Sequence, residues 1–381
     1  MTSCVLMTST MKLGGTLIEK YLDDLERRLD AEVEDDLLQQ WRTFTTGDFT
    51  GDIFSPRRLK KLPPSIPWPR VLVNEALESY EMMALQQLGA CSRALEDGSG
   101  QLLTVRSNYG TGIVPTMFGA DLFLMDAEID TLPTAVPLGG IASTHLEDSL
   151  KPVGESQAAA AVKQLLARGI PELTHALGGK VLEMAAFYQE MFTPYPKIQQ
   201  YVHLYHPDMQ GPMDICELLW GSSLFVALVE APDLVTQLLD LVTDTYIAYM
   251  RAWTKMVPFE GDSSFHWAMM QTGNIMIRDD SAMNLSSRMF AKFIAPYDER
   301  LLTEFGGGAI HFCGRGDHYI AQAAALDGLG TINMSQPEYN DMDRIFDHTV
   351  DKGINIIGLP RDAALTALAQ GRELRGRVHC W

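Results

Sequence analysis

The sequence is poor in cysteine and in basic residues. Its 381 residues include five cysteines, an odd and sparse set that argues against a disulfide framework and for reduced thiols. It has 30 Lys and Arg against 49 Asp and Glu, a formal net charge of −19. Because nucleic acids and anionic membranes repel an acidic surface, neither is expected as the main partner.

The sequence also lacks long apolar runs and phosphate-binding motifs. It contains no run of 18 apolar residues, and the start "MTSCVLMTSTMKLGG" lacks the charged and apolar regions of a secretory signal, so we expect a cytoplasmic protein. The glycines of "GGGAIHFCG" match neither GxGxxG nor a following GK[ST], which gives a nucleotide cradle little support.

What the sequence does contain is an alternation of apolar strand signals and helical signals. Short apolar segments such as "LLTVRSN", "SSFHWAMMQ", "AIHFCG", "TINMSQP", "INIIGLP" and "RVHCW" are separated by amphipathic helical stretches. This α/β pattern predicts a (β/α)8 TIM barrel with an N-terminal helical extension, and an open doubly wound sheet is the second choice. We expect the extension, with its proline-rich arm "FSPRRLKKLPPSIPWPR", over residues 1–70 and the barrel over 71–381. The arm could embrace a neighbouring subunit and so form a homodimer.

His311 and Cys313 form the most informative pair. Residues two apart on a strand face the same way, so both side chains project from the end of "AIHFC". Imidazole and thiolate together suit zinc. Cys380, at the end of the last predicted strand, is the third candidate ligand. The alternative is that the two cysteines are small core residues and His311 is a hydrogen-bonded core histidine.

Other polar residues follow predicted strands and could line the same pocket. The segment "RDDSAMN" precedes a helix whose N-cap we expect at Ser286. A carboxylate there could contact substrate or orient a zinc ligand, although the segment could also be an ion-paired loop. The candidate catalytic residues are Asp280, His206 and Tyr109. The candidate substrate-binding residues are Asn108, Gln271, Arg278, Asn333 and Gln336. For several of them, turn formation or packing is the alternative.

The second half of the chain resembles the uroporphyrinogen decarboxylase superfamily. The resemblance rests on "GNIMIRDDSAMNLSSRMFAKFIAPYDERLLTEFGGGAIHFCGRG" and the following "LDGLGTINMSQPEYNDMDRIFDHTVDKGINIIG". The arginine-rich substrate motif of true decarboxylases, of the "RQAGRY" kind, is not recognisable. The HxC pair with a distant cysteine is similar instead to the zinc-dependent, corrinoid-linked methyltransferases of that superfamily.

The resemblance implies a barrel enzyme that moves a methyl group between a cobamide on a partner protein and a thiol or pterin acceptor. Zinc would be held by His311, Cys313 and Cys380. A decarboxylase-like lyase acting on a carboxylated small molecule, and a non-catalytic binding subunit of a corrinoid system, are the alternatives.

Overall fold

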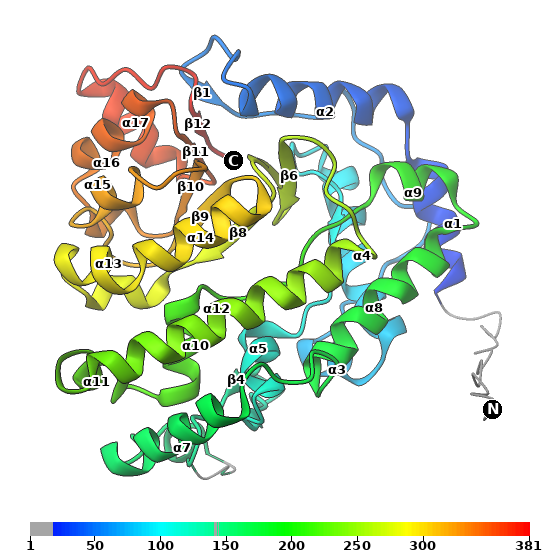
Figure 1. Ribbon diagram of the computed structural model, residues 1–381. Helices are drawn as coiled ribbons and strands as arrows, with labels where there is room; N and C mark the ends of the chain where they lie inside the picture. The colour runs from blue at the N-terminus through cyan, green and yellow to red at the C-terminus, as the bar shows by residue number, and fades with distance from the viewer. Residues whose placement is uncertain (1–17, 141–142, 144) are drawn as a thin grey trace, which may run out of the picture.

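The computed structural model describes residues 18–140, 143 and 145–381. Cys4 and the beginning of the predicted N-terminal helical region lie outside the described residues. The described chain is a mixed α/β structure built around a parallel sheet (Figure 1). The sheet has six strands in the order β1-β12-β11-β10-β9-β8. These strands are β1 (Ile53–Phe54), β8 (Ile275–Arg278), β9 (Gly308–Phe312), β10 (Leu329–Met334), β11 (Asn355–Ile357) and β12 (Val378–His379).

Three strand pairs lie outside this sheet. One is parallel, and the other two are antiparallel hairpins. They are β2 (Thr104–Val105) with β5 (His203–Leu204), β3 (Leu122–Phe123) with β4 (Thr134–Ala135), and β6 (Ser263–His266) with β7 (Met269–Thr272). The α/β class is therefore confirmed, whereas the described strand pairing does not close a barrel.

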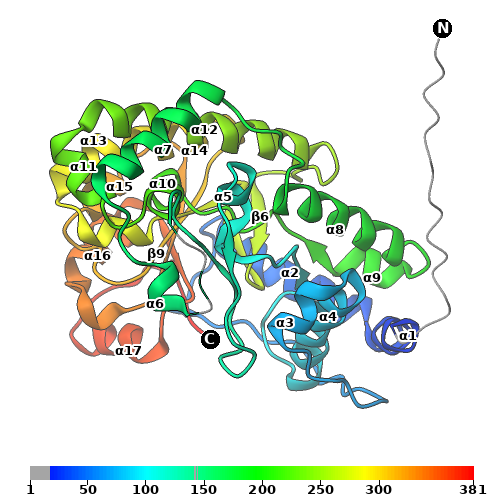
Figure 2. The same ribbon diagram turned by 90° about the horizontal axis from the view of Figure 1, so that it is seen from below.

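Helices separate most of the strands. Seen from below, α1 to α4, α8 and α9 gather at one side of the molecule and α13 to α17 at the other (Figure 2). The helices of the first half are α1 (Glu19–Arg28), α2 (Ala31–Thr45), α3 (Val73–Glu78), α4 (Tyr80–Asp97), η1 (Gly110–Gly112), α5 (Ile113–Met117), α6 (Leu146–Ser149), α7 (Glu155–Arg168) and α8 (Leu177–Phe192). Those of the second half are α9 (Pro196–Tyr201), α10 (Pro212–Trp220), α11 (Leu224–Glu230), α12 (Pro232–Thr254), η2 (Asp280–Asn284), α13 (Ser287–Phe293), α14 (Ala295–Phe305), α15 (Ile320–Ala323), η3 (Pro337–Tyr339), α16 (Met342–His348), η4 (Val350–Lys352) and α17 (Arg361–Ala369).

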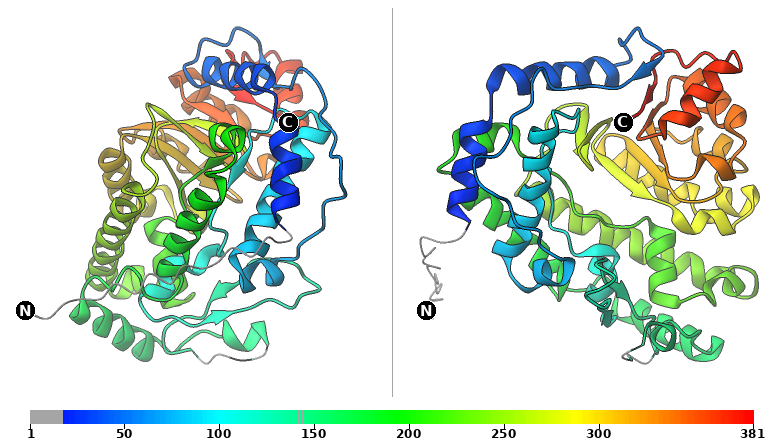
Figure 3. Two further views of the ribbon diagram at one scale, coloured as in Figure 1. Left: turned by 90° about the vertical axis from the view of Figure 1, so that its right-hand side faces the viewer. Right: turned by 180° about the vertical axis from the view of Figure 1, so that it is seen from behind.

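The second N-terminal helix, α2, packs on the end of the sheet, whereas α1 packs against α9 and α4. Asp30 caps α2 by accepting a hydrogen bond from the Glu32 N–H. α2 lies near the C-terminal end of the chain (Figure 3). Its buried face carries Trp41, whose ring centroid lies 4.6 Å from that of His379 on β12. The preceding segment also supplies β1, which pairs with β12. The proposed division at residue 70 stays a prediction, although the segment before it contributes one strand to the sheet.

The segment "SSFHWAMMQ" is a hairpin, which corrects the expectation of a single strand. Its turn residues Trp267 and Ala268 have φ of 46° and 60°, a left-handed conformation usually reserved for Gly or Asn. The turn is pinned because the Leu102 N–H donates to the Ala268 carbonyl at 2.8 Å. At the other end, the Thr272 N–H donates to Thr331 Oγ1, so β7 lies against the face of β10 that carries Thr331. Tertiary hydrogen bonds thus hold a turn that local sequence does not favour.

Ladder register places three polar side chains in one row. β9 is buried throughout, and its pairing aligns Arg278 of β8 with His311, and His311 with Asn333 of β10. In-register residues of neighbouring parallel strands share a face of the sheet. Gly308 permits the close approach of β9 to β8, because a Cβ there would lie 2.1 Å from the Ile275 carbonyl oxygen. The row Arg278–His311–Asn333 is therefore fixed by the backbone.

In the part of the chain that the structure describes, no single helix is long and apolar enough to cross a membrane. α10 and α11 would meet that test only together, and they are bent by 104° at the break between them.

Candidate functional site

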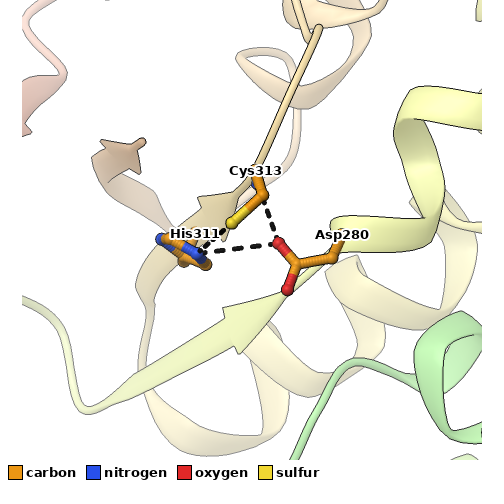
Figure 4. Close-up of side chains that lie close together, drawn as sticks. All are labelled: Asp280, His311 and Cys313. Carbon is orange, nitrogen blue, oxygen red and sulfur yellow. Dashed lines mark hydrogen bonds and ion pairs between the residues drawn. The ribbon is translucent and has the colours of Figure 1, made fainter. Parts of the chain in front are cut away.

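Three potential metal ligands meet at the carboxyl end of β9 (Figure 4). His311 is on the strand, Cys313 follows it, and Asp280 begins η2 after β8. Their ligand atoms all lie within 4.8 Å of one another. The Cys313 Sγ is 3.4 Å from His311 Nε2, and Asp280 Oδ1 is 3.6 Å from the same nitrogen. The predicted convergence of His311 and Cys313 is thus present, with Asp280 as a third neighbour.

A chain of hydrogen bonds orients the His311 ring. The Asn333 Nδ2 donates to the Ile357 carbonyl at 2.7 Å, which leaves its Oδ1 as the acceptor 2.5 Å from His311 Nδ1. The proton of a neutral ring therefore lies on Nδ1, and Nε2 turns a lone pair toward Cys313 and Asp280. A neutral imidazole with one bare nitrogen is the form that binds metals.

Burial sets the protonation of both soft ligands. It lowers the pKa of His311 and raises the pKa of the Cys313 thiol, in each case because the charged form loses its hydration. Without a cation, the site therefore holds a neutral imidazole and a neutral thiol. A bound divalent cation reverses the balance for the thiol, which then binds as thiolate.

The donor set fits zinc. Imidazole nitrogen, thiolate sulfur and carboxylate oxygen are all zinc ligands, and three protein ligands leave the open position that catalytic zinc requires. The Asp280 side chain is 41% exposed and that of His311 8%, so the group is reached from one side. The neighbouring cavity of about 440 Å³ is lined by Asp280 and Gln210 among others.

Backbone amides support the loops that carry these ligands. The Cys313 N–H donates to Asp280 Oδ1 at 2.8 Å, and the Gly314 N–H donates to Gln336 Oε1 at 2.6 Å. The carboxylate of Asp214 accepts from the N–H groups of Asp280 and the residue after it. Asn333 and Gln336 were predicted to bind substrate. In the structure, Asn333 orients the candidate ligand His311, and Gln336 accepts from the loop that follows Cys313.

Cys380 is not among the atoms that converge on His311. It is fully buried, its N–H donates to the Phe54 carbonyl, and burial raises the pKa of its thiol to about 11. Its role as a ligand stays a prediction.

Among the described residues, four other candidates make no hydrogen bond to the three ligands. Both ring nitrogens of His206 are engaged, with the Pro207 carbonyl at 2.8 Å and with the Met276 N–H at 3.0 Å. Burial lowers the pKa of His206 to about 4. Tyr109 is buried, and burial together with the nearby Tyr80 and Glu183 raises its pKa. The other two of these four are Asn108, whose side-chain oxygen is buried with no partner in the described part of the chain, and Gln271, whose amide nitrogen donates to Ser264.

Sequence reasoning missed the charged cluster beside the site. Arg278 was a candidate, but Arg106 and Asp208 were not. Asp208 Oδ2 accepts from Arg106 Nη1 at 2.5 Å and also pairs with Arg278. Trp267 lies between the cluster and the ligands, with its ring 4.1 Å from the Arg278 guanidinium carbon and 5.0 Å from the His311 ring. A charged residue directly after an apolar strand, as in "LLTVRSN", was the available signal for Arg106.

Asn333→Ala is expected to lower zinc affinity by about 10- to 100-fold, because His311 loses the acceptor that fixes its tautomer and orientation. Zinc binding by competition with a chromophoric chelator measures this. Asn355→Ala is the matched control, since Asn355 is a buried amide on the neighbouring strand that bonds to Thr45 instead. Equal losses in both variants would mean general destabilisation rather than loss of ligand orientation.

Comparison with known proteins yields a fold relationship. No protein-family profile matches the chain, and no curated protein matches it by sequence. Among solved structures, the chain is similar to a methyltransferase from Methanosarcina mazei, with a TM-score of 0.53 and 16% sequence identity over 81% of each chain. At this identity, the similarity establishes a shared fold.

Proposed function

We propose that this chain is a zinc-dependent methyltransferase that moves a methyl group between a corrinoid on a partner protein and a thiol or pterin acceptor. The observation that carries the proposal is the bare Nε2 of His311, directed at the Cys313 thiol and the Asp280 carboxylate. The structural similarity to a methyltransferase also supports the proposed methyltransferase function.

The proposal includes a (β/α)8 barrel. The six-stranded sheet and the β2–β5 pair supply eight parallel strands in the described ranges. Two hydrogen bonds link β8 of the six-stranded sheet to the segment that follows β5 of the two-stranded pair. The Met276 N–H of β8 donates to His206 just after β5, and the Gly211 N–H donates to the Arg278 carbonyl. The candidate ligands lie at or just after the carboxyl ends of β8 and β9, which is where barrel enzymes place their chemistry.

Each residue of the site has its own role in the proposed reaction. His311 and Cys313 would hold the metal, with Asp280 or Cys380 as third ligand. Zinc, when bound, would supply the Lewis acidity that lets an acceptor thiol lose its proton near neutral pH. Asn333 keeps the His311 tautomer correct, and the Trp267 ring shields one side of the imidazole from water. Alignment of acceptor and methyl carbon is then the main task left to the pocket.

A carboxy-lyase is the second candidate. The observation in its favour is the pair of arginines that share Asp208, because cationic side chains beside the site suit a carboxylated substrate.

Metal analysis followed by a methyl-transfer assay tests the proposal. We expect about one zinc per chain in protein purified without chelators, and loss of the methyl group from methylcobalamin when a thiol or pterin is added, followed by the corrinoid absorption spectrum. Absence of stoichiometric zinc would exclude the zinc mechanism. Zinc without demethylation by any thiol or pterin favours the binding subunit, and release of carbon dioxide from a carboxylated substrate favours the lyase.

A further inference from the structure

The cluster of Arg106, Asp208 and Arg278 carries more positive than negative charge. Both guanidinium groups pair with the same oxygen, Asp208 Oδ2, so one carboxylate faces two cations. The side chains of both arginines are only 13% exposed, and that of Asp208 is 5% exposed. An excess positive charge that is largely buried costs desolvation free energy unless an anion pairs with it.

The Arg278 guanidinium is held in place but keeps an N–H group that can still donate a hydrogen bond. Its guanidinium lies over the Trp267 ring, which fixes the plane of the group. Its Nε is buried and has no hydrogen-bond partner among the described residues. Two carboxyl groups follow it in the chain. Asp279 is fully buried beside Asp298, and Asp280 attracts the guanidinium through space while its Oδ1 accepts from the Cys313 N–H. Among the described residues, neither of these carboxyl groups forms a hydrogen bond or a close ion pair with Arg278, which pairs with Asp208.

The cluster lies beside the candidate metal ligands. Arg278 and His311 are register partners on neighbouring strands, which are about 4.8 Å apart in parallel sheets, and Trp267 contacts both side chains. A small molecule that reaches Cys313 and His311 can thus place a group on Arg278 only a few bonds away.

We propose that Arg278 and Arg106 form the binding site for a monoanionic group, a carboxylate in the simplest case, on the small substrate that reacts at the His311–Cys313 centre. A single uncompensated charge suits a monoanion better than a phosphate dianion. A planar guanidinium with free N–H groups also matches the geometry of a carboxylate. The assignment of this anion as substrate rests on the proposed function, whereas the anion site itself does not.

The test compares matched ligands that differ in one charge. Binding of 3-mercaptopropionate and of 3-mercaptopropionamide to the zinc-loaded protein is measured by titration calorimetry, and propionate and propionamide are compared on metal-free protein. We expect each carboxylate to bind at least about tenfold more tightly than its amide, as one charge-assisted contact provides. Inorganic phosphate should bind more weakly than propionate. Equal binding of acid and amide by the wild-type protein, or preferred binding of phosphate, would overturn the proposal.

Variants assign the preference to the arginines. Arg278→Gln should remove the preference for the carboxylate, and Arg278→Lys should keep part of it. Asp208→Asn should strengthen carboxylate binding, because it removes the competing charge. Arg251→Gln is the control, since Arg251 is an exposed arginine paired with Glu304 on the helical surface. A preference that survives Arg278→Gln in folded protein, or that Asp208→Asn weakens, would contradict the site.

One further variant separates the two proposals. Cys313→Ser should abolish zinc binding and methyl transfer but leave the preference for propionate over propionamide intact. If the wild-type protein transfers no methyl group yet retains that preference, the proposed function fails and the anion site stands. If transfer occurs without any preference, the anion site fails alone.

Discussion

His311→Ala should lower the affinity of the protein for zinc by about 100- to 1,000-fold. Apparent binding free energies of about 10–16 kcal/mol in zinc sites are shared among a few ligands, and each 1.4 kcal/mol corresponds to a factor of ten. His311 is also the ligand most strongly preset, because Asn333 holds its proton on Nδ1. Equilibrium competition with a chelator of known affinity measures the loss.

His318→Ala is the matched control for this experiment. His318 lies seven residues later, and its Nε2 is 2.7 Å from the Leu285 carbonyl. The His318→Ala variant should leave the zinc affinity unchanged within about twofold, since a single substitution away from the metal ligands has only a small effect on the structure. If the His311→Ala variant binds zinc as tightly as the wild-type protein, His311 is not a metal ligand and the proposed metal centre is wrong.

A second pair of variants identifies the third ligand. Asp280→Ala removes the carboxylate that lies 3.6 Å from His311 Nε2, and Cys380→Ser removes the thiol that the sequence pattern suggested. The variant with the larger loss of zinc affinity marks the ligand. The two are distinguishable by spectroscopy as well, because cobalt substituted for zinc absorbs strongly in the near ultraviolet in proportion to its thiolate ligands.

The sequence was sufficient where local periodicity determines geometry. Alternation along a strand predicts that His311 and Cys313 share a face, and the 3.4 Å between Nε2 and Sγ agrees with this. The N-cap at Ser286 is confirmed by its hydrogen bond from the Met289 N–H. Such features depend on a few neighbouring residues and therefore can be read from one segment.

The sequence was insufficient where partners come from distant segments. Asn333 was predicted to contact substrate, but the register between β9 and β10 sets its oxygen against His311. The cluster around Asp208 joins residues that follow β2 and β5 with the last residue of β8. The Trp267 turn lacks the Gly or Asn that would signal it and is held by contacts with Leu102 and Thr104. No spacing rule connects these segments before the chain is folded.

The buried pair Asp279 and Asp298 leads to a prediction about stability. Asp279 directly follows β8, and Asp298 lies on α14. Both side chains are fully buried and lie close enough to shift each other's pKa, and no other group hydrogen-bonds to either carboxyl group among the described residues. Burial raises the pKa of both, that of Asp298 to about 8. Near neutral pH, the folded protein therefore keeps at least one proton on this pair of carboxyl groups.

Asp298→Asn should stabilise the protein, and the gain should grow as pH rises. The pKa of Asp298 is raised above its unfolded value near 3.8, so the unfolded chain releases a proton between about pH 4 and 8 that the folded protein retains. The wild-type free energy of unfolding accordingly falls with rising pH in that window, by at most about 1.4 kcal/mol per pH unit for one proton. Asparagine donates an N–H to Asp279 in place of that proton and does not titrate. The advantage of the variant should be smallest near pH 4 and level off above pH 8.

Denaturant unfolding at several pH values, with a chelator present throughout, measures the difference between variant and wild type. Asp327→Asn serves as the control, because Asp327 is exposed and its replacement should change stability by less than about 0.5 kcal/mol at any pH. Asp298→Ala should instead destabilise the protein, since it removes the buried polar group beside Asp279 and opens a cavity. A difference between Asp298→Asn and wild type that does not vary with pH would mean that the buried pair does not hold a proton, and the raised pKa of Asp298 would then be wrong.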